Sequence, residues 1–472
     1  MGLVRFLKTR SGLRVDNTKT TSAANLTLRQ SLWPLMLVTI LFFLWGFAYG
    51  LLDTLNKHFQ VTLNITRTRS SGLQAAYFGA YPLASLGYAN WLLRHYGYKL
   101  VFIFGLILYG IGALCMWPAG LNRSFGGFCA ATFVIGSGLG SLETAANPYL
   151  AVCGPPKYAE IRINLAQAFN GIGTVVAPAL ASYVFFTDTE DSVNALKRVQ
   201  WVYLAIGIFV FVLAAVFFMS TIPEVTDQDM AFQVAATHVD EQDKPFWKQY
   251  KLFHATFAQF TYTGAQASYF INYATETWPT VDNSTGSKYL AGAQAAFTVG
   301  RFLGAFLMRY IRPRWVFLGY ISGVVAFCAA STTQRNATGV AMLFLTLFFE
   351  SVCFPTIVAL GIRGLGRHYK RGSGFIVGGV SGGAAIPPLL AHVADLRNDT
   401  GFAFIVPTMF MVLAWTYAVA VNFVPAYRDT VDKVGSSEIG LTGSEVGEGG
   451  IKNAEDVEAL GANEKGKVFH VR

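Results

Sequence analysis

Two carboxylates lie in stretches of sequence that are otherwise small or apolar. Glu143 stands in GLGSLETAANPYL, residues 138–150, and Asp53 stands in FLWGFAYGLLDTLNKHF, residues 43–59. An ionised side chain at the centre of a lipid bilayer costs roughly 2.5 to 3.5 kcal/mol on insertion scales, because burial disfavours the charged form. A carboxyl group in such a place can take up and release a proton near neutral pH. Glu143 and Asp53 are therefore candidate proton-coupling residues.

Each of the two carboxylates also has a structural interpretation. Glu143 fits a carboxyl group that is hydrogen-bonded across a helix interface built from small residues. Asp53 fits a salt bridge with Lys57, one helical turn later, near the end of its span.

A third carboxylate, Glu350, is followed five residues later by a proline, as Glu143 is, and 207 residues separate the two glutamates. Glu350 is either a second titrating site or a structural carboxyl satisfied by a neighbouring helix.

Amide and aromatic side chains recur at helical spacing in three apolar stretches. Neutral, hydroxyl-rich ligands need paired hydrogen-bond donors and acceptors together with apolar surfaces for their C–H groups. These side chains therefore predict a ligand site, with hydrogen bonding between helices as the alternative. The candidate ligand residues are Tyr49, which is four residues before Asp53, Gln167 and Asn170 in RINLAQAFNGIG, and Gln259, Tyr262 and Gln266 in AQFTYTGAQASYF.

The composition indicates a protein that crosses a membrane many times. Hydrophobic residues make up 53% of the 472 residues and charged residues 13%, with a mean hydropathy of +0.41; globular domains carry roughly 25% charged residues. The net charge of +9 is spread over short loops, which favours a positive-inside topology over nucleic-acid binding.

A bilayer helix needs about 20 apolar residues. On that basis we predict an all-α protein with twelve spans: 31–57, 73–93, 99–120, 125–152, 162–186, 200–222, 252–276, 288–310, 313–333, 338–362, 372–395 and 401–425.

The spans divide six and six around one long polar gap. We expect an N-terminal arm over 1–30, a six-helix bundle over 31–222, a linker over 223–251, a second bundle over 252–425 and a disordered tail over 426–472. With a cytosolic N-terminus the even-numbered loops face the cytosol, and they carry most of the loop arginines and lysines. Arm, linker and tail are then all cytosolic.

Glycosylation sequons support the same orientation. Five Asn-x-Ser/Thr sites fall in or beside the odd-numbered, external loops, and one more, Asn25, falls in the arm and does not fit. The five external candidates are Asn64, Asn122, Asn283, Asn336 and Asn398.

Catalytic and metal-dependent functions find little support in the sequence. The glycine-rich stretches do not follow a strand or match a phosphate-binding fingerprint. The seven histidines lack metal-ligand spacing, and the five cysteines lie at unrelated spacings in or beside apolar spans. We therefore expect no enzyme activity, no cofactor and no metal.

Several of these stretches together resemble the fucose permease branch of the major facilitator superfamily, the fucose–galactose–glucose proton symporters. The resemblance covers residues 38–425 and rests on LFFLWGFAYGLLDTLNKHFQ, GLGSLETAANPYLAVCGP, RINLAQAFNGIG, AQFTYTGAQASY, VGRFLGAFL and FPTIVALGIRGLG. It implies two six-helix bundles that rock about a central cavity, and uptake of a monosaccharide driven by protons. Asp53 and Glu143 match the family's coupling acids, and Trp45, Gln167 and Asn170 match cavity-facing positions.

The sequence also departs from the bacterial pattern of that family. Tyr49, Gly50 and Leu52 stand in a region where the bacterial pattern has asparagines, and Glu350 stands where it has an apolar residue. The expected protein is a plasma-membrane symporter, functional as a monomer, for a sugar such as L-fucose, galactose or glucose. The alternatives are a facilitator-type exporter of another small metabolite and a sugar receptor that does not transport.

Overall fold

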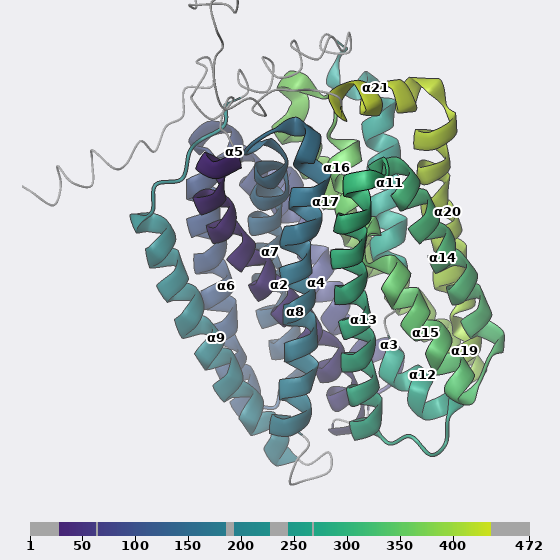
Figure 1. Ribbon diagram of the computed structural model, residues 1–472. Helices are drawn as coiled ribbons and strands as arrows, with labels where there is room; N and C mark the ends of the chain where they lie inside the picture. Colours follow the sequence, from purple (N-terminus) through teal and green to yellow (C-terminus); the bar gives the residue numbers. More distant parts are fainter. Residues whose placement is uncertain (1–27, 63–64, 186–192, 227–243, 267–268, 436–472) are drawn as a thin grey trace, which may run out of the picture.

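The computed structural model describes residues 28–62, 65–185, 193–226, 244–266 and 269–435, and every regular element within these ranges is a helix. We call residues 28–226 the N-terminal half and residues 244–435 the C-terminal half. The helices run along one another as a bundle, with α21 at one end and α3 and α12 at the other (Figure 1). These are called the α21 end and the α3 end below.

The N-terminal half follows the predicted spans closely. Helix α7 begins at a capping residue: Ser124 accepts from the Gly127 N–H through its hydroxyl at 3.1 Å, and α7 starts directly after it. The helices of this half are α2 (Leu28–Thr62), α3 (Arg67–Ser70), α4 (Gly72–Pro82), the π-helix η2 (Leu83–Tyr88), α5 (Ala89–Tyr96), α6 (Tyr98–Leu121), α7 (Phe125–Val152), the 3-10 turn η3 (Pro156–Tyr158), α8 (Ala159–Phe185) and α9 (Val193–Met219).

The C-terminal half contains more interrupted helices. Asp282 caps α13 by accepting from the Thr285 N–H at 2.9 Å, and Pro313 stands at the start of α14. The elements are η4 (Phe246–Lys248), α11 (Tyr250–Ala265), α12 (Phe270–Thr277), α13 (Asn283–Tyr310), α14 (Pro313–Thr333), α15 (Asn336–Glu350), α16 (Cys353–Gly361), η5 (Gly366–His368), α17 (Tyr369–Gly378), η6 (Gly379–Ser381), α18 (Gly382–Arg397), α19 (Thr400–Ala403), α20 (Ile405–Phe423) and α21 (Pro425–Gly435).

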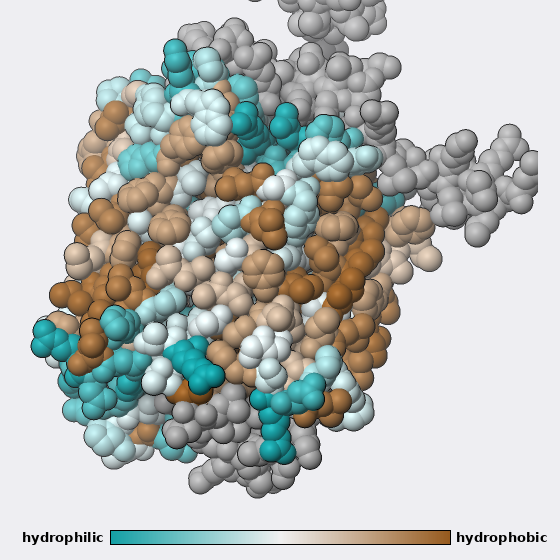
Figure 2. Space-filling model, turned by 180° about the vertical axis from the view of Figure 1, so that it is seen from behind, coloured by the Kyte–Doolittle hydropathy of each residue, from teal (hydrophilic) through white to brown (hydrophobic). Residues whose placement is uncertain are grey.

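The surface has the apolar belt that a bilayer requires. On the face that Figure 2 shows, hydrophobic residues predominate over the middle of the molecule and hydrophilic residues gather at its two ends. Nine helical segments of the described chain are long and apolar enough to cross a membrane. The other three predicted spans, 73–93, 162–186 and 252–276, correspond to α4–η2–α5, α8 and α11–α12. The all-α, multi-span prediction is confirmed.

Part of the predicted disordered tail is a helix. Residues 425–435 form α21, whose Asp432 pairs with Arg312 at 2.9 Å and with Arg314 at 3.1 Å. These ion pairs, together with Val431 and Tyr427 packed on the hydrophobic core, hold the segment, whose low hydrophobicity was the basis for predicting disorder. The remainder of the tail, 436–472, lies outside the described residues, as do the arm over 1–27 and most of the linker, 227–243.

Contacts between the two halves form one layer at each end. At the α21 end Arg363 pairs with Glu160 at 2.5 Å, and the Tyr369 hydroxyl donates to the Pro148 carbonyl at 2.9 Å. At the α3 end Arg67 pairs with Glu276 at 2.7 Å and with Asp395 at 3.0 Å. Between these layers α8 packs on α13, and α4 packs on α18. The interior between the layers is therefore bounded on both sides.

Candidate functional site

A cavity lies between the two halves, at the middle of their helices. It holds about 630 Å³ of space free of protein atoms, its open mouth included. Both halves contribute polar and aromatic groups to its wall. The lining residues are Trp45, Tyr49, Phe78, Gln167, Asn170, Thr174, Thr263, Gln266, Gln294, Phe297, Arg301, Leu347, Glu350, Phe354 and Val380. Pockets of this kind, apolar with a few convergent polar groups, are typical binding sites for small molecules.

Aromatic rings from both halves supply the apolar part of the wall. Trp45 on α2 meets Phe354 on α16 edge to face, with ring centroids 6.0 Å apart. Tyr49, one turn further along α2, meets Phe78 on α4 at 6.1 Å. Edge-to-face pairs leave ring faces available, and such faces suit the C–H surface of a sugar ring.

The amides predicted on α8 lie in this cavity because α8 packs tightly against α2. A Cβ atom placed on Gly46 would come within 1.8 Å of the Asn170 carbonyl oxygen, so only glycine permits this approach. Gln167 and Asn170 are 2% and 8% exposed, and both line the cavity. The side-chain N–H₂ group of Gln167 has no hydrogen-bond acceptor among the described residues, which leaves a buried donor for a ligand.

Arg301 on α13 joins the two halves inside the cavity. Its side chain is 3% exposed, and its Nη1 donates to the Asn170 Oδ1 atom at 2.7 Å and to the Gln167 carbonyl. Its Nε donates to the Ser351 carbonyl at 3.0 Å, and the guanidinium lies 4.3 Å from the centre of the Phe297 ring. The guanidinium is permanently charged and rigid, so it offers a fixed donor to an oxygen-rich ligand.

Sequence reasoning missed Arg301, although it stands in the quoted stretch VGRFLGAFL. A charge inside an apolar span is by itself a reason to suspect function. Gln294, Phe297 and Arg301 are also spaced three and four residues apart, and therefore share one face of α13. That face is the one that lines the cavity.

Glu350 lies at a break in the tenth span. Helix α15 ends at Glu350 and α16 begins at Cys353, whereas α7 continues past Glu143 and Pro148 without interruption. The break frees two backbone carbonyls: the Glu350 carbonyl accepts from the Tyr262 hydroxyl at 2.8 Å, and that of Ser351 accepts from Arg301. The Glu350 side chain is 3% exposed and lines the same cavity as Arg301.

The three residues predicted on the seventh span have different surroundings. Gln266 lines the cavity and donates to the Tyr262 hydroxyl at 3.3 Å. Tyr262 is fully buried behind the wall, where it holds the broken span in place. Gln259 is also fully buried, donates to the Thr263 hydroxyl at 3.3 Å and lies away from the cavity wall. Of the three, the structure places only Gln266 where it can touch a ligand directly.

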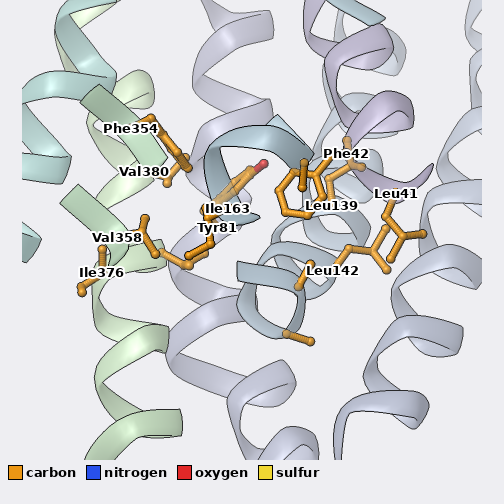
Figure 3. Close-up of a cluster of buried hydrophobic side chains, with 14 of the residues drawn as sticks. Leu41, Phe42, Tyr81, Leu139, Leu142, Ile163, Phe354, Val358, Ile376 and Val380 are labelled. Atoms are coloured by element: carbon orange, nitrogen blue, oxygen red, sulfur yellow. The ribbon is translucent and has the colours of Figure 1, made fainter. Parts of the chain in front are cut away.

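Glu143 lies in a smaller pocket next to the central cavity. Leu41, Phe42, Leu139 and Leu142 line this pocket, and Figure 3 shows these four side chains beside one another. Glu143 is 1% exposed; its Oε1 accepts from the Asn147 side chain at 3.1 Å, and its Oε2 has no partner among the described residues. Trp45 lines both spaces and so forms the wall between Glu143 and the central cavity.

Other predicted sites stand at or beyond the limits of the described structure. Asp53 belongs to α2, one turn after Tyr49, but its side chain lies outside the described part. Asn64 lies outside as well. Asn122, Asn283, Asn336 and Asn398 are at helix ends, and the use of all five sequons stays a prediction. Within the described residues no three histidine, cysteine or acidic side chains are grouped as metal ligands.

Comparisons with known proteins agree with this architecture. The model of the Major Facilitator Superfamily matches residues 35–388. The L-fucose-proton symporter of Escherichia coli K12 is 30% identical over 417 residues, which is 83% of this chain and 93% of that protein. A glucose/galactose transporter of Brucella abortus (biovar 1, strain 9-941) is 33% identical over 380 residues, or 78% of this chain and 89% of that one.

Solved structures show the same fold. The crystal structure of the transporter FucP in the outward conformation superposes with a TM-score of 0.65 at 29% identity, over 82% of this chain and 98% of that one. The proton:xylose symporter XylE, bound to 6-bromo-6-deoxy-D-glucose, gives 0.63 at 13% identity over 83% of this chain and 95% of that one, a likeness of fold alone. The chain therefore belongs to the Major Facilitator Superfamily, in the group that includes the L-fucose-proton symporter and the glucose/galactose transporters.

Proposed function

We propose that the chain is a secondary active transporter that takes up a monosaccharide together with protons, by alternating access of the central cavity to the two sides of the membrane. The observation that carries the proposal is the composition of the cavity wall. The indole ring of Trp45 provides an apolar surface, while the Gln167 amide and the Arg301 guanidinium provide hydrogen-bond donors. The names of the relatives, an L-fucose-proton symporter and glucose/galactose transporters, support this class of cargo.

Sugar binding would exploit contacts that already cross between the halves. Arg301 bonds to Asn170 from the opposite half, and a sugar hydroxyl can replace or extend that bond. Because both halves hold the ligand, its binding favours the state in which they are close together. A ligand shifts a conformational equilibrium only through its different affinity for the two states. In this structure the two halves are in contact at both ends of the cavity, and this closed arrangement is the state that a bound sugar would favour.

Glu143 is the group we propose to carry the proton. It takes up a proton to become a neutral carboxylic acid when its pocket communicates with the outside, and returns it as a carboxylate on the other side. The groups beside its carboxyl group are neutral, the Asn147 amide and the nearby Tyr81 hydroxyl, so a charge has little to stabilise it in this closed state. Trp45 connects this pocket with the sugar cavity and thereby couples the two events. We propose Asp53 as a second coupling acid, on its sequence match alone.

We assign Glu350 a structural role, in which its carboxylate balances a positive charge and does not carry a transported proton. It lines the same cavity as the Arg301 cation, so its carboxylate can compensate that charge in a site of low dielectric constant. The bacterial pattern has an apolar residue here, so this compensation is a property of the present chain. Of the other residues that depart from that pattern, Tyr49 lines the cavity and distinguishes the sugar site further, whereas Gly50 and Leu52 do not line it.

We propose the plasma membrane as the location, with both termini cytosolic and the transporter active as a monomer. The α21 end is then cytosolic. Sugar and protons are the only partners that the proposal requires besides the bilayer.

The direct test is uptake of radiolabelled L-fucose, D-galactose, D-glucose and L-rhamnose into cells that lack their own transporters. We expect accumulation of at least one sugar under an inward proton gradient, and none after an ionophore collapses the gradient. Failure of all four sugars to enter, with the protein present at the surface, would refute the sugar assignment. Uptake that is indifferent to the ionophore would refute the proton coupling.

A further inference from the structure

A second cavity lies at the α21 end, away from the proposed sugar site, and holds about 880 Å³ of space free of protein atoms, its open mouth included. Residues of η3 and α8 line it from the N-terminal half, while α13, α14 and α21 line it from the C-terminal half. The lining residues are Lys157, Tyr158, Ile161, Met308, Arg309, Tyr310, Ile311, Arg312, Pro313, Arg314, Arg363, Val431 and Asp432. It exists only while the two halves are in contact at this end.

The described residues do not balance the charge of this cavity. Five cationic residues line it, whereas the ion pairs of the described structure supply two carboxylates, Asp432 to Arg312 and Arg314, and Glu160 to Arg363. Lys157 and Arg309 have no ion pair within the described ranges. The Nε of Arg363 is buried without an acceptor there. Positive-inside loops usually carry such charges singly, but here five of them line one half-open cavity.

An apolar strip leads from this cavity along the outside of the molecule. On α8, Ile161 lines the cavity, and Leu165 and Phe169 follow at intervals of four residues, both exposed. On α13, Tyr310 lines the cavity, and Phe306 and Leu303 precede it on the same side, also exposed. Helices α8 and α13 lie side by side (Figure 1), and Met308, at their contact, forms the floor between them.

We propose that this cavity binds the phosphate headgroup of an anionic phospholipid, with the acyl chains lying along the exposed apolar faces of α8 and α13. Guanidinium and ammonium groups are the side chains that recognise phosphate. Anionic lipids are concentrated in the cytosolic leaflet, and basic pockets between membrane helices bind their headgroups. The strip of Leu165, Phe169, Phe306 and Leu303 begins at the cavity, so an acyl chain can lie on it while the headgroup is bound, whereas a free phosphate ion would contact the basic groups alone.

Such a lipid would also act on the conformational equilibrium. Lys157 comes from the N-terminal half and Arg309 from the C-terminal half, and the headgroup phosphate between them joins the two halves at this end. It binds the state that is closed at the α21 end and not a state in which the halves have separated there, so it stabilises the closed state. This inference uses the proposed orientation but not the identity of the sugar.

The test compares thermal unfolding of the full-length protein in nanodiscs of phosphatidylcholine alone, of phosphatidylcholine with phosphatidylglycerol, and of phosphatidylcholine with inorganic phosphate in the buffer. We expect the melting temperature to rise with phosphatidylglycerol and not with inorganic phosphate. The variant Lys157→Gln/Arg309→Gln should lose this rise and bind the lipid roughly 30-fold more weakly, since each cation near the surface contributes about 1 kcal/mol. Both side chains are exposed, so the variant is expected to fold.

The matched control is Lys244→Gln/Lys248→Gln, which removes two exposed charges in and before η4 that do not line the cavity. It should keep the lipid effect. An equal loss in both double variants would mean unspecific attraction to a charged surface, and would overturn the proposal. A melting temperature that rises equally with inorganic phosphate would overturn the lipid assignment, and no rise in any arm would overturn the site. None of these outcomes depends on whether a sugar is transported.

Discussion

The Nη1 atom of Arg301 donates to the Oδ1 atom of Asn170 at 2.7 Å, and this bond links α13 to α8 across the two halves of the molecule inside the central cavity. The same guanidinium is bonded to the Ser351 carbonyl at the break of the tenth span. The Arg301 side chain is therefore bonded both to the opposite half and to the broken helix, so a movement of either one changes its hydrogen bonds. Any ligand that enters the cavity meets this group.

Arg301→Lys should therefore impair transport although it keeps the charge. Lysine is a point charge and cannot hold Asn170, the Gln167 carbonyl and the Ser351 carbonyl at once. Breaking a hydrogen bond to a buried charged group costs about 1.5 to 3 kcal/mol, which predicts roughly a 10- to 100-fold loss in uptake rate over KM. Initial uptake rates over a range of sugar concentrations measure this. Arg335→Lys, at a partly exposed pair with Asp399 away from the cavity, is the control and should transport nearly normally; equal rates for Arg301→Lys and the control would refute the role.

Gly46→Ala should destabilise the protein. The added Cβ would lie 1.8 Å from the Asn170 carbonyl oxygen, so α2 and α8 would have to move apart. Overpacking of this kind costs about 1 to 3 kcal/mol. Gly319→Ala on α14 is the matched control, since its Cβ would meet nothing within 4 Å. Thermal unfolding in detergent should show a lower melting temperature for Gly46→Ala only, and an unchanged value would show that the helices are not so close.

Arg67→Gln should weaken closure at the α3 end. Arg67 holds Glu276 of α12 and Asp395 of α18, and both of its ion pairs join the two halves. Spin labels are attached to cysteines that replace Arg69 and Arg397, two exposed residues at that end, in a protein from which the native cysteines have been removed. The distance between the labels reports how far apart the two halves are at the α3 end. The distance distribution should shift to longer values in the variant. A second label pair at His95 and Lys248, exposed residues of α5 and η4 at the α21 end, should show no lengthening; lengthening at both ends would indicate general loosening rather than a lock.

Glu350→Gln should alter charge compensation without removing proton coupling. If Glu350 balances Arg301, the variant leaves an uncompensated cation in the cavity and should lower the uptake rate. The double variant Glu350→Gln/Arg301→Gln should then be no worse than Arg301→Gln alone. Sugar accumulation should still respond to the proton gradient in Glu350→Gln. Gradient-independent uptake in this single variant would instead make Glu350 a proton carrier.

Hydropathy was sufficient to place the membrane spans but not to find their interruptions. The predicted span 125–152 coincides with α7. The mean hydropathy of a stretch of about 20 residues indicates whether that stretch is stable inside a bilayer, so it locates such spans directly. The same sum cannot detect that α15 stops at Glu350 and α16 restarts at Cys353. The free carbonyls at that break are satisfied by Tyr262 and Arg301, which come from other helices.

The site could be predicted by residue type more readily than by position. Gln167 and Asn170 reach the cavity, whereas Gln259, an amide of the same kind at similar spacing, is buried behind it. Helical periodicity gives the residues that share a face, but the face that meets the other half depends on packing such as that of Gly46 against Asn170. The helix α21 was missed because the groups that hold it are distant in the sequence: its ion pairs are with Arg312 and Arg314, more than a hundred residues earlier, and its Val431 packs on the hydrophobic core.

The central claim is that Glu143 couples protons to sugar, and it is tested most directly by comparing two assays of Glu143→Gln. Glutamine keeps the shape and the bond with Asn147 but cannot take up a proton. We predict that the variant no longer accumulates sugar against a gradient in proteoliposomes with an inward proton gradient, yet still exchanges labelled for unlabelled sugar at a rate near that of the wild type. Accumulation at the wild-type level in Glu143→Gln would contradict the account.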